Sequence, residues 1–494
     1  MTINIQSEEA QTRENRLNAI TGYRGSIKDL VDKTGCGALK NKERCFSQTS
    51  NCSSGCAQGQ LATIVDAAVV NHGPLGCSAE IIATNVQTQM SQTINGRKLT
   101  TVNVINTNMT EDMTVFGGAE ILKEGVREAF RRFNPKAIFV TTSCASGIIG
   151  DDVKSILAEV EEELSIPVVP VFCEGFRSKV WASGFDAAYH AVLTRIVKPP
   201  QKKRPELVNI ITFRSNLGGF AAMTQILGRI GLVPRFVLAD NTIEELSKLS
   251  EAAATLSVCG TLGGYLGNGL EQHFGVPFVK ALQPHGIEGI NSWLRELGKV
   301  VGKEREVEEY IAEEQKRIAD ELSEIRKKLK GKRAVVGMGP SFSHSYVRVL
   351  QEIGVEVIWA AAWHFDQHYD HGTIPEATLE LSKREKDIQI SVADQQNFEM
   401  LNLLTKLKPD IYVSRHPGLS VWSTKLGIPS LMVSDVYTAL GYEGTLEFGY
   451  RIIDTLANNS LARNLSKRIT LPYSNWWFQQ DSFDFLKDEE FAPV

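Results

Sequence analysis

The chain has 494 residues, of which 43% are hydrophobic and 22% charged, and its formal net charge at pH 7 is −5. This length exceeds what one hydrophobic core can hold, so about three domains are expected. The slightly acidic balance offers no basic face for a nucleic acid, and no apolar run reaches the roughly 20 residues that cross a membrane. The polar, acidic start of the chain has no apolar export segment, which predicts a cytoplasmic protein with no membrane partner.

Short β-branched runs alternate with helix-like stretches along the chain, which is the pattern of parallel sheets wound with helices. The clearest expected strands span residues 137–143, 168–173, 208–213, 255–260, 334–339, 355–362, 410–415 and 429–434. We therefore predict an α/β fold built of three Rossmann-like, doubly wound parallel-sheet domains. In such sheets, ligands collect at the carboxyl ends of the strands.

Two stretches divide the chain into predicted domains. Residues 198–206, KPPQKKRPE, are a proline- and lysine-rich linker, and the highly charged residues 303–330 carry apolar side chains at helical spacing. The second stretch predicts a surface helix that shows one apolar stripe to the body. The predicted parts are domains 20–200, 205–300 and 331–470 and a C-terminal tail, 471–494, whose aromatic residues are expected to contact another subunit or the body of the chain.

Three of the eight cysteines lie in loops of the first predicted domain. Cys144 directly follows the expected strand 137–143, Cys77 ends the loop HGPLGC, and Cys52 opens the segment NCSSGCAQG. Thiolates are soft ligands that select iron–sulfur clusters, zinc or Cu(I), and in a cytoplasmic chain they favour metal chemistry over disulfides. Zinc sites usually show closely paired cysteines, a spacing that only Cys52 and Cys56 offer here, so the scattered thiols favour one large cluster gathered inside a domain, with zinc as the alternative.

A fourth thiol, Cys259, ends the expected strand 255–260 and precedes the glycine-rich stretch GTLGGYLGNG. Glycines there allow very close backbone approach. No His–Asp pair stands at a spacing for nucleophilic catalysis, so metal ligation and simple packing remain the two interpretations. Cys173 ends an apolar strand and is predicted to be an inert core thiol.

Histidines gather after the expected strand 355–362, where WHFDQHYDHG supplies His364, His368 and His371, and His344 follows another strand end. Their spacing suits metal ligands, but a polar loop with solvated imidazoles is the simpler interpretation. Phosphate-binding motifs are missing, since the chain has neither GxxxxGKS nor GxxxxGKT, and GMGPSF lacks the third glycine of a dinucleotide fingerprint. We therefore expect no direct binding of ATP or NAD.

In chain order, the segments NHGPLGC, NMTEDMTVFGG, TTSCASGIIGDDV, VPVFCEGFRS and LGYEG closely resemble the nitrogenase component-1 family over about residues 30–470. That family includes the molybdenum–iron protein subunits, a cofactor-assembly scaffold and nitrogenase-like reductases. The resemblance implies that the domains surround a cofactor cleft. It also implies that Cys52, Cys77 and Cys144 hold half of an 8Fe-7S P-cluster, shared with a homologous β-like subunit in an α2β2 heterotetramer. Cys56 is the alternative to Cys52, and Cys173 matches a family cysteine that is not a ligand.

Cys259 matches the cysteine by which the α-type catalytic subunit holds the terminal iron of its large iron–sulfur cofactor. The resemblance therefore implies an α-like chain. The surroundings depart from the family pattern in four places, with Trp181 and Phe185 at polar positions and Asn85 and Phe342 at arginine positions. The histidine that binds molybdenum has no equivalent, so the cofactor is expected to be like the iron–molybdenum cofactor or its heterometal-free precursor.

The second ligand of this cofactor is left open among four residues, His364, His368, His344 and Asp435. The resemblance does not assign catalytic residues. The side chains expected to line the cofactor pocket are Trp181, Phe185, Phe342 and His364.

The replaced positions predict an apolar pocket for a small organic molecule. Among the family members, the methylthio-alkane reductases, which cleave C–S bonds, fit this profile best, with electrons passing from an ATP-hydrolysing iron protein through the P-cluster. The alternative is a non-catalytic scaffold for cofactor assembly, which the spacing of Cys52 and the additional Cys36 and Cys45 favour. Nitrogenase proper is the third interpretation.

Overall fold

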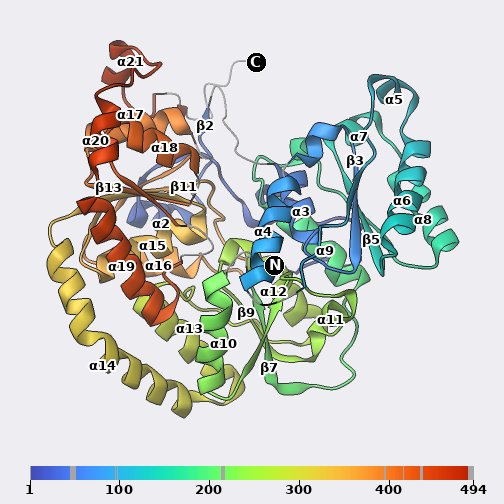
Figure 1. Ribbon diagram of the computed structural model, residues 1–494, viewed down its shortest axis with the longest axis horizontal. Helices are drawn as coiled ribbons and strands as arrows, with labels where there is room; N and C mark the ends of the chain where they lie inside the picture. The colour runs from blue at the N-terminus through green and yellow to red at the C-terminus, as the bar shows by residue number, and fades with distance from the viewer. Residues whose placement is uncertain are drawn as a thin grey trace. The chain divides into compact units, whose positions relative to one another are not determined.

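Parallel strands joined by helices make up most of the chain, as Figure 1 shows. The computed structural model describes residues 2–44, 52–79, 81–94, 96, 98–212, 217–393, 396–415, 417–433, 438–484, 486 and 487. Contacts divide the chain into unit 1, comprising Met1–Arg16, Asn51–Val258 and Leu262–Val279, and unit 2, comprising Leu17–Ser50, Cys259–Thr261 and Lys280–Val494. In the described part of the chain, no helix is both long and apolar enough to cross a membrane.

The first sheet of unit 1 is parallel throughout and has the strand order β4-β3-β5-β6. Its strands are β3 (Ala67–His72), β4 (Val104–Asn106), β5 (Ala137–Thr142) and β6 (Val168–Val171). Strands β3 and β5 are buried along their whole length, as expected for the centre of a parallel sheet covered on both faces. Helices α6 (Ala119–Phe133) and α8 (Val153–Leu164) add Val126 and Leu157 to the same apolar core.

The second sheet of unit 1 is also parallel, with the order β8-β7-β9. Its strands are β7 (Arg204–Ile211), β8 (Val233–Val237) and β9 (Ala252–Ser257). Figure 1 shows α10 (Leu217–Arg229) and α11 (Ile243–Ser247) on opposite sides of these strands. Strand β7 begins inside the predicted linker, because Arg204 already pairs with Ala252 of β9.

The other helices that begin before Lys280 precede these two sheets, follow their strands or connect them. They are α1 (Arg13–Leu17), α3 (Ser53–Leu61), α4 (Ile81–Ile94), α5 (Glu111–Phe116), α7 (Cys144–Ile149), α9 (Ser183–Arg195) and α12 (Gly260–Phe274), with α2 (Ile27–Gly35) in unit 2. Short 3-10 turns span Leu75–Ser78, Gly175–Arg177 and Leu249–Glu251.

Unit 2 is built on a six-stranded sheet with the order β1-β12-β11-β10-β13-β14. Its strands are β1 (Tyr23–Ser26), β10 (Arg333–Met338), β11 (Glu356–Ala362), β12 (Gln389–Val392), β13 (Ile411–Ser414) and β14 (Ser430–Met432). All neighbours are parallel except β1, which runs antiparallel to β12 at one edge. The helices of this unit are α13 (Gly286–Val301), α14 (Glu304–Leu329), α15 (Pro340–Glu352), α16 (Glu376–Ser382), α17 (Asn397–Leu407), α18 (Pro417–Lys425), α19 (Gly441–Ala457), α20 (Ser460–Ser466) and α21 (Asn475–Gln479).

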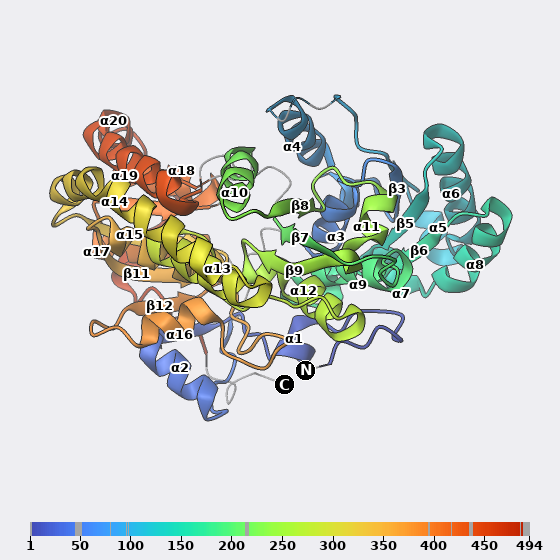
Figure 2. The same cartoon turned by 90° about the horizontal axis from the view of Figure 1, so that it is seen from below.

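Helix α14 confirms the predicted surface helix with a single apolar stripe. Its buried side chains include Ile311, Ile318, Leu322, Ile325 and Leu329, while most of the charged residues between them are exposed. The stripe packs on α13 and α19 of the same unit. Figure 2 shows α14 and α19 on one side of the strands and α2 and α16 on the other.

The aromatic tail packs on unit 2. Phe483 stacks on Trp359 with ring centroids 5.6 Å apart, and Asn402 donates a hydrogen bond to the Trp477 carbonyl. Strand β15 (Leu486–Lys487) pairs antiparallel with β2 (Glu43–Arg44). Trp476 is 65% exposed, so the predicted subunit contact of the tail stays a prediction.

The three sheets confirm the predicted α/β class of parallel strands wound with helices. Six of the expected strands appear as β5, β6, β10, β11, β13 and β14, while β7 and β9 begin a few residues earlier than expected. The predicted domain bounds stay a prediction, because the division into two units follows contacts alone.

Candidate functional site

Two of the three predicted ligand thiols of unit 1 lie where a helix begins, and the third lies inside a short turn. Cys52 is the N-cap of α3, Cys77 lies in the turn Leu75–Ser78, and Cys144 is the first residue of α7. All three are exposed free thiols, and Cys52 Sγ accepts a hydrogen bond from the Gly55 N–H at 3.4 Å.

Gly175 shows that the thiols approach one another. A Cβ atom built at Gly175 would lie 3.3 Å from Cys52 Cβ and 3.5 Å from Cys144 Sγ. Partial burial, followed by the negative charges of Cys52 and Cys144, raises the pKa of Cys77. The three thiols therefore surround one site, and the backbone of Gly175 forms part of its wall. Among the described residues, no three His, Cys, Asp or Glu side chains are placed to hold a single metal ion.

Side-chain amides hold the Cys77 loop in place. Gln58 Nε2 donates to the Cys77 carbonyl at 3.0 Å and to Asn71 Oδ1 at 3.2 Å. Asn106 Nδ2 donates to the Pro74 carbonyl at 3.2 Å. Soft donors, fixed loops and an open face together fit a multi-iron cluster that takes its remaining ligands from elsewhere.

The two other cysteines of this region are buried. Cys173 is 4% exposed, burial raises its pKa to about 12, and its thiol donates to the Thr142 carbonyl. It is therefore a core thiol, as predicted. Cys56 is also 4% exposed and lies within α3 rather than at its N-terminus. Cys36 is exposed at the end of α2, and Cys45 lies outside the described residues.

Cys259 belongs to unit 2 and lies in the turn between β9 and α12, where it is 4% exposed. A Cβ atom at Gly260 would lie 2.2 Å from Tyr369 Oη and 3.0 Å from Ser341 Oγ, so only glycine fits there. The Thr261 N–H donates to Ser341 Oγ at 3.2 Å, and Ser341 Oγ lies 3.2 Å from Tyr369 Oη. This close approach is the one that the glycine-rich stretch predicts.

The side chain of Arg415 interacts electrostatically with this thiol. Arg415 directly follows β13, and its Cζ lies 4.2 Å above the ring of Phe342. Burial lowers the pKa of Arg415 to about 10, while the charges of Cys259 and Tyr346 act in the opposite direction. The guanidinium therefore stays charged at neutral pH and lies within electrostatic reach of Cys259.

Two further aromatic rings pack against Phe342. Tyr346 stacks on it with ring centroids 5.9 Å apart, and the His285 ring lies 4.7 Å from it. Tyr346 Oη accepts a hydrogen bond from the Ala439 N–H at 2.9 Å. Burial, and then the charge of Glu376, raises the pKa of Tyr369, so its hydroxyl keeps its proton.

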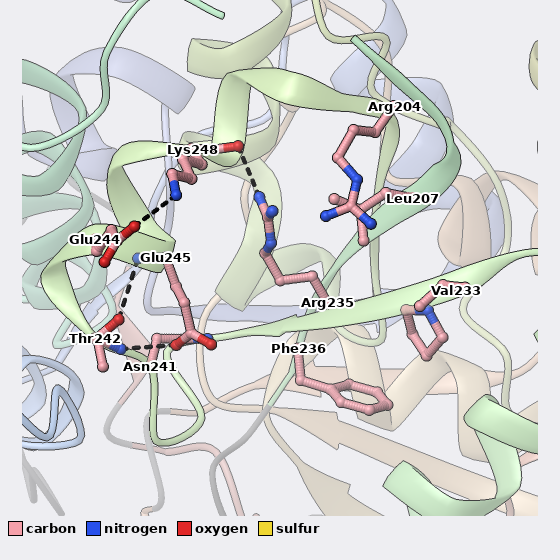
Figure 3. Close-up of a pocket in the computed structure, with 11 residues that line it drawn as sticks. Arg204, Leu207, Val233, Arg235, Phe236, Asn241, Thr242, Glu244, Glu245 and Lys248 are labelled. Atoms are coloured by element: carbon pink, nitrogen blue, oxygen red, sulfur yellow. Dashed lines mark hydrogen bonds and ion pairs between the residues drawn. The ribbon is translucent and has the colours of Figure 1, made fainter. Parts of the chain in front are cut away.

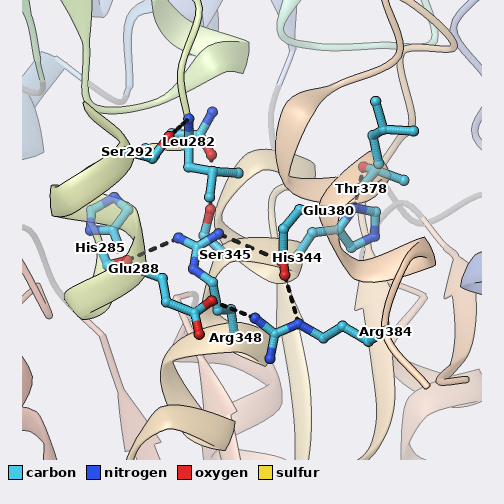
Figure 4. Close-up of polar contacts among 12 residues, drawn as sticks. Leu282, His285, Glu288, Ser292, His344, Ser345, Arg348, Thr378, Glu380 and Arg384 are labelled. Carbon is cyan, nitrogen blue, oxygen red and sulfur yellow. Dashed lines mark hydrogen bonds and ion pairs between the residues drawn. The ribbon is translucent and has the colours of Figure 1, made fainter. Parts of the chain in front are cut away.

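A buried polar network anchors the segment that carries His285 (Figure 4). Arg348 is fully buried, donates to the His285 carbonyl at 2.9 Å, and has Glu352 at 3.8 Å. Glu352 in turn accepts the Ile287 and Glu288 N–H groups at the start of α13. Burial raises the pKa of Glu352 to about 7, and the charge of Arg348 opposes that rise.

The histidines predicted as second ligands have different surroundings. His344 is buried, its Nδ1 lies 2.6 Å from Thr378 Oγ1, and burial lowers its pKa to about 4. His364 is 1% exposed and lies 3.8 Å from Asp366, which makes the expectation of a solvated imidazole wrong for this residue. His371 lies 3.0 Å from Glu376, and His368 is partly buried. Asp435 lies outside the described residues.

Two predicted pocket residues lie in unit 1. Trp181 and Phe185 meet edge to face with ring centroids 5.7 Å apart at the start of α9. Phe342, the third predicted aromatic, lies in unit 2 on α15. Asn85 makes a hydrogen bond within unit 1, where its Oδ1 accepts the Val102 N–H.

Sequence reasoning missed three residues near Cys259, namely Ser341, Tyr369 and Arg415. Arg415 ends an expected strand, and the rule that ligands collect at strand ends is the signal that could have found it. Tyr369 lies in the histidine-rich loop, but nothing in the local sequence shows that it reaches Gly260.

Unit 1 also carries an open pocket of about 590 Å³ on its second sheet (Figure 3), lined by none of the predicted site residues. Four of its five charged side chains have partners within it, and the fifth, Arg204, pairs with Glu206 outside it. Arg235 donates to the Lys248 carbonyl, Lys248 pairs with Glu244, and Glu245 accepts the Thr242 N–H.

A parallel α/β protein with exposed thiols close together and a separate buried thiol at a strand end has the features expected of the class that holds iron–sulfur clusters. The chain matches the family model described as nitrogenase component 1 type oxidoreductase over residues 52–457, and it belongs to that family.

The relatives include both catalytic and assembly proteins. The nitrogenase molybdenum-iron protein alpha chain of Methanosarcina barkeri is 28% identical over 84% of this chain and 86% of that one. The nitrogenase iron-molybdenum cofactor biosynthesis protein NifE of Methanococcus maripaludis is 29% identical over 82% of both. The solved structure titled nitrogenase Cp1 at pH 5 has a TM-score of 0.72, 25% identity, and covers 91% of this chain and 100% of its own. These findings confirm the predicted family and its α-type subunit.

Proposed function

We propose that this chain is the α-type subunit of a nitrogenase-like reductase that acts on a small organic substrate. In this proposal Cys52, Cys77 and Cys144 hold half of a P-cluster, and Cys259 anchors a large iron–sulfur cofactor. The observation that carries the proposal is the approach of Cys52 and Cys144 to Gly175, with Cys77 within electrostatic reach of both, together with the separate buried thiol of Cys259, whose charge acts on Arg415. Cys52 is preferred to Cys56, because Cys52 borders Gly175 while Cys56 is buried in α3.

A β-like partner subunit would complete the first cluster. Leu75 is 66% exposed, Ile148 75% and Phe176 56%, and each lies within a few residues of the thiol site. Apolar side chains gathered around exposed metal ligands support a covering partner. The proposed assembly is an α2β2 heterotetramer like that implied by the family.

Cluster binding at the thiol site can be tested by adding one methyl group to its wall, at Gly175. Gly175→Ala would place a Cβ against Cys52 and Cys144 and is expected to lower the iron content of the purified complex. Gly76→Ala is the matched control, because a Cβ beside Cys77 at that position meets nothing within 4 Å. Equal iron in the two variants would count against a cluster at this site.

The second site fits an anionic cluster. A cluster held at Cys259 would supply electrons at low potential. The chain itself fixes the position of the thiol through Ser341 and Tyr369, and it offers the Arg415 cation. The second ligand is proposed among His364, His368, His344 and Asp435, of which His344 already pairs with Thr378.

Reductive C–S cleavage of methylthio-alkanes is the proposed reaction. It breaks one C–S bond, takes up two electrons and two protons, and releases a thiol and a hydrocarbon. Trp181 and Phe185, which meet edge to face in unit 1, support an apolar substrate. The electrons would come from an ATP-hydrolysing iron protein, in keeping with the absence of a phosphate-binding motif in this chain.

The decisive experiment combines the purified complex with its iron protein, ATP, reductant and dimethyl sulfide. We expect methane and methanethiol in equal amounts, and no product from the Cys259→Ala complex. Product formation by Cys259→Ala at the normal rate, or no turnover of any methylthio compound by the intact complex, would overturn this reaction.

A cofactor-assembly scaffold is the second candidate. It is supported by the relative named as a cofactor biosynthesis protein, which is as similar to this chain as the molybdenum-iron protein alpha chain is. A scaffold would transfer its cluster to apo-nitrogenase and restore dinitrogen reduction there, without turnover of its own. Transfer without methanethiol production would favour this function over the reductase.

A further inference from the structure

We propose that Arg415 is a positioning residue that balances the negative charge of the cluster bound at Cys259 and so sets its reduction potential. The inference rests on the proposed cofactor site and adds to it a residue that the thiol motifs do not contain. Arg415 acts through its positive charge, which the Phe342 ring holds in position.

Strand topology explains why Arg415 reaches this site. Strands β10 and β13 are parallel neighbours, with Gly337 opposite Ser414. Phe342 follows β10 and Arg415 follows β13, so both leave the same edge of the sheet. The carboxyl edge of a parallel sheet is where ligands bind, and the two side chains meet there at 4.2 Å.

The ring beneath the guanidinium is held firmly. Phe342 is 3% exposed, stacks on Tyr346 and contacts His285. A guanidinium above an aromatic face gains about 0.5–2 kcal/mol, so the ring fixes where the charge stands. This geometry gives a directed cation rather than a mobile surface arginine.

The negative charge at Cys259 compensates the positive charge of Arg415. Burying a guanidinium is costly unless a negative charge faces it. The turn that holds Cys259 is tied to the segment of this ring, because Ser341, the residue before Phe342, accepts the Thr261 N–H at 3.2 Å. The charge of Cys259 also favours the charged form of Arg415. A thiolate-bound cluster becomes more negative on reduction, so a fixed neighbouring cation stabilises the reduced form and raises the potential.

The test measures potential and iron rather than turnover alone. Arg415→Gln is expected to move the reduction midpoint of the Cys259 cluster to lower potential and to speed iron loss to a chelator. Arg415→Lys keeps the charge, so its reduction midpoint and its rate of iron loss are expected to lie close to those of the wild type. Lys425→Met is the matched control, because it removes another cation 4.2 Å above a ring, that of Trp422 on α18, and should change neither.

Phe342→Leu provides a second, independent variant, since it keeps the charge but removes its platform. Its midpoint should shift in the same direction as that of Arg415→Gln, by a smaller amount. An unchanged midpoint in both variants overturns the role of Arg415. Wild-type complex with no more iron than Cys259→Ala overturns the cofactor site as well, so the two failures are distinguishable.

Discussion

Asp186 is a buried charge whose partners are both arginines. It is 0% exposed on α9, accepts a bidentate pair of hydrogen bonds from Arg13 at 2.9 and 2.7 Å, and also pairs with Arg16. Replacing it with alanine leaves two buried guanidiniums without their carboxylate. We expect Asp186→Ala to lower the free energy of unfolding by about 3–5 kcal/mol.

Denaturant unfolding of the cluster-free chain, followed by circular dichroism, measures this loss. Glu324→Gln is the control, because its pair with Lys327 is exposed on α14 and exposed pairs contribute little. If Asp186→Ala unfolds at the same denaturant concentration as Glu324→Gln, the buried triad does not stabilise unit 1 as described.

His344 should make stability depend on pH. Its pKa is about 4 in the folded chain and near its ordinary value of 6.5 in the unfolded chain, so the unfolded state takes up the proton first. Stability is therefore full above pH 6.5 and falls as the pH drops towards 4, by at most about 1.4 kcal/mol per pH unit.

His344→Gln isolates this effect, because glutamine has no charge to gain and can still bond Thr378. The difference in unfolding free energy between wild type and variant, measured from pH 7 down to 4, should change in the stated direction. Glu352 titrates with the opposite sign, but it contributes equally to both proteins. A constant difference across this range would show that His344 does not titrate as stated.

Residues that stand in a characteristic local motif can be proposed from the sequence, and the ligand role of the three thiols stays a prediction. Cys52, Cys77 and Cys144 lie in characteristic loops, and the structure gathers them. Arg415 was not predicted, because its role depends on Phe342, a residue more than seventy positions earlier. The same contact modifies the expected apolar pocket, since a cation covers the ring that was expected to line it.

Two helices of unit 1 cross closely enough that only glycine fits between them. A Cβ at Gly184 in α9 would lie 1.9 Å from the carbonyl oxygen of Ser53, the first residue of α3. Backbone cannot yield as a side chain can, so Gly184→Ala must displace α3. We expect it to lower the free energy of unfolding by about 1–3 kcal/mol and, because Cys52 caps α3, to reduce iron content too.

Gly228→Ala is the matched control, because Gly228 lies in helix α10 with nothing within 4 Å of a new Cβ. It should be neutral or stabilising by up to about 1 kcal/mol, since alanine favours helix. Thermal unfolding of both variants gives the comparison. Equal melting temperatures would mean that α3 and α9 tolerate a larger separation.

Elements with a strong local signal were predicted and those formed by distant pairing were not. Strands such as β5 and β10 are continuous buried runs, which identify central parallel strands. Strand β1 has only four residues of mixed burial and exists because Tyr23–Ser26 pair with Gln389–Val392. No local pattern shows a pairing across more than 360 residues.

At the scale of the whole molecule, the exposed thiols and their apolar neighbours predict a subunit interface. Ile148 on α7 is 75% exposed and lies four residues after Cys144. A carboxylate there would have to be buried without a partner if a β-like subunit covers the site. We expect Ile148→Asp to shift the co-expressed complex from heterotetramer to free subunits and to lower its iron content.

Leu461→Asp on α20 is the matched control, because Leu461 is 70% exposed but belongs to unit 2, away from the thiol trio in sequence. Size-exclusion chromatography with light scattering measures assembly, and iron analysis measures the cluster. Loss of assembly and iron together in Ile148→Asp alone would mean that the chain needs its partner to hold the first cluster. If Ile148→Asp assembles and binds iron as the wild type does, the partner covers another face, and the exposed thiols of this chain then hold their cluster without it.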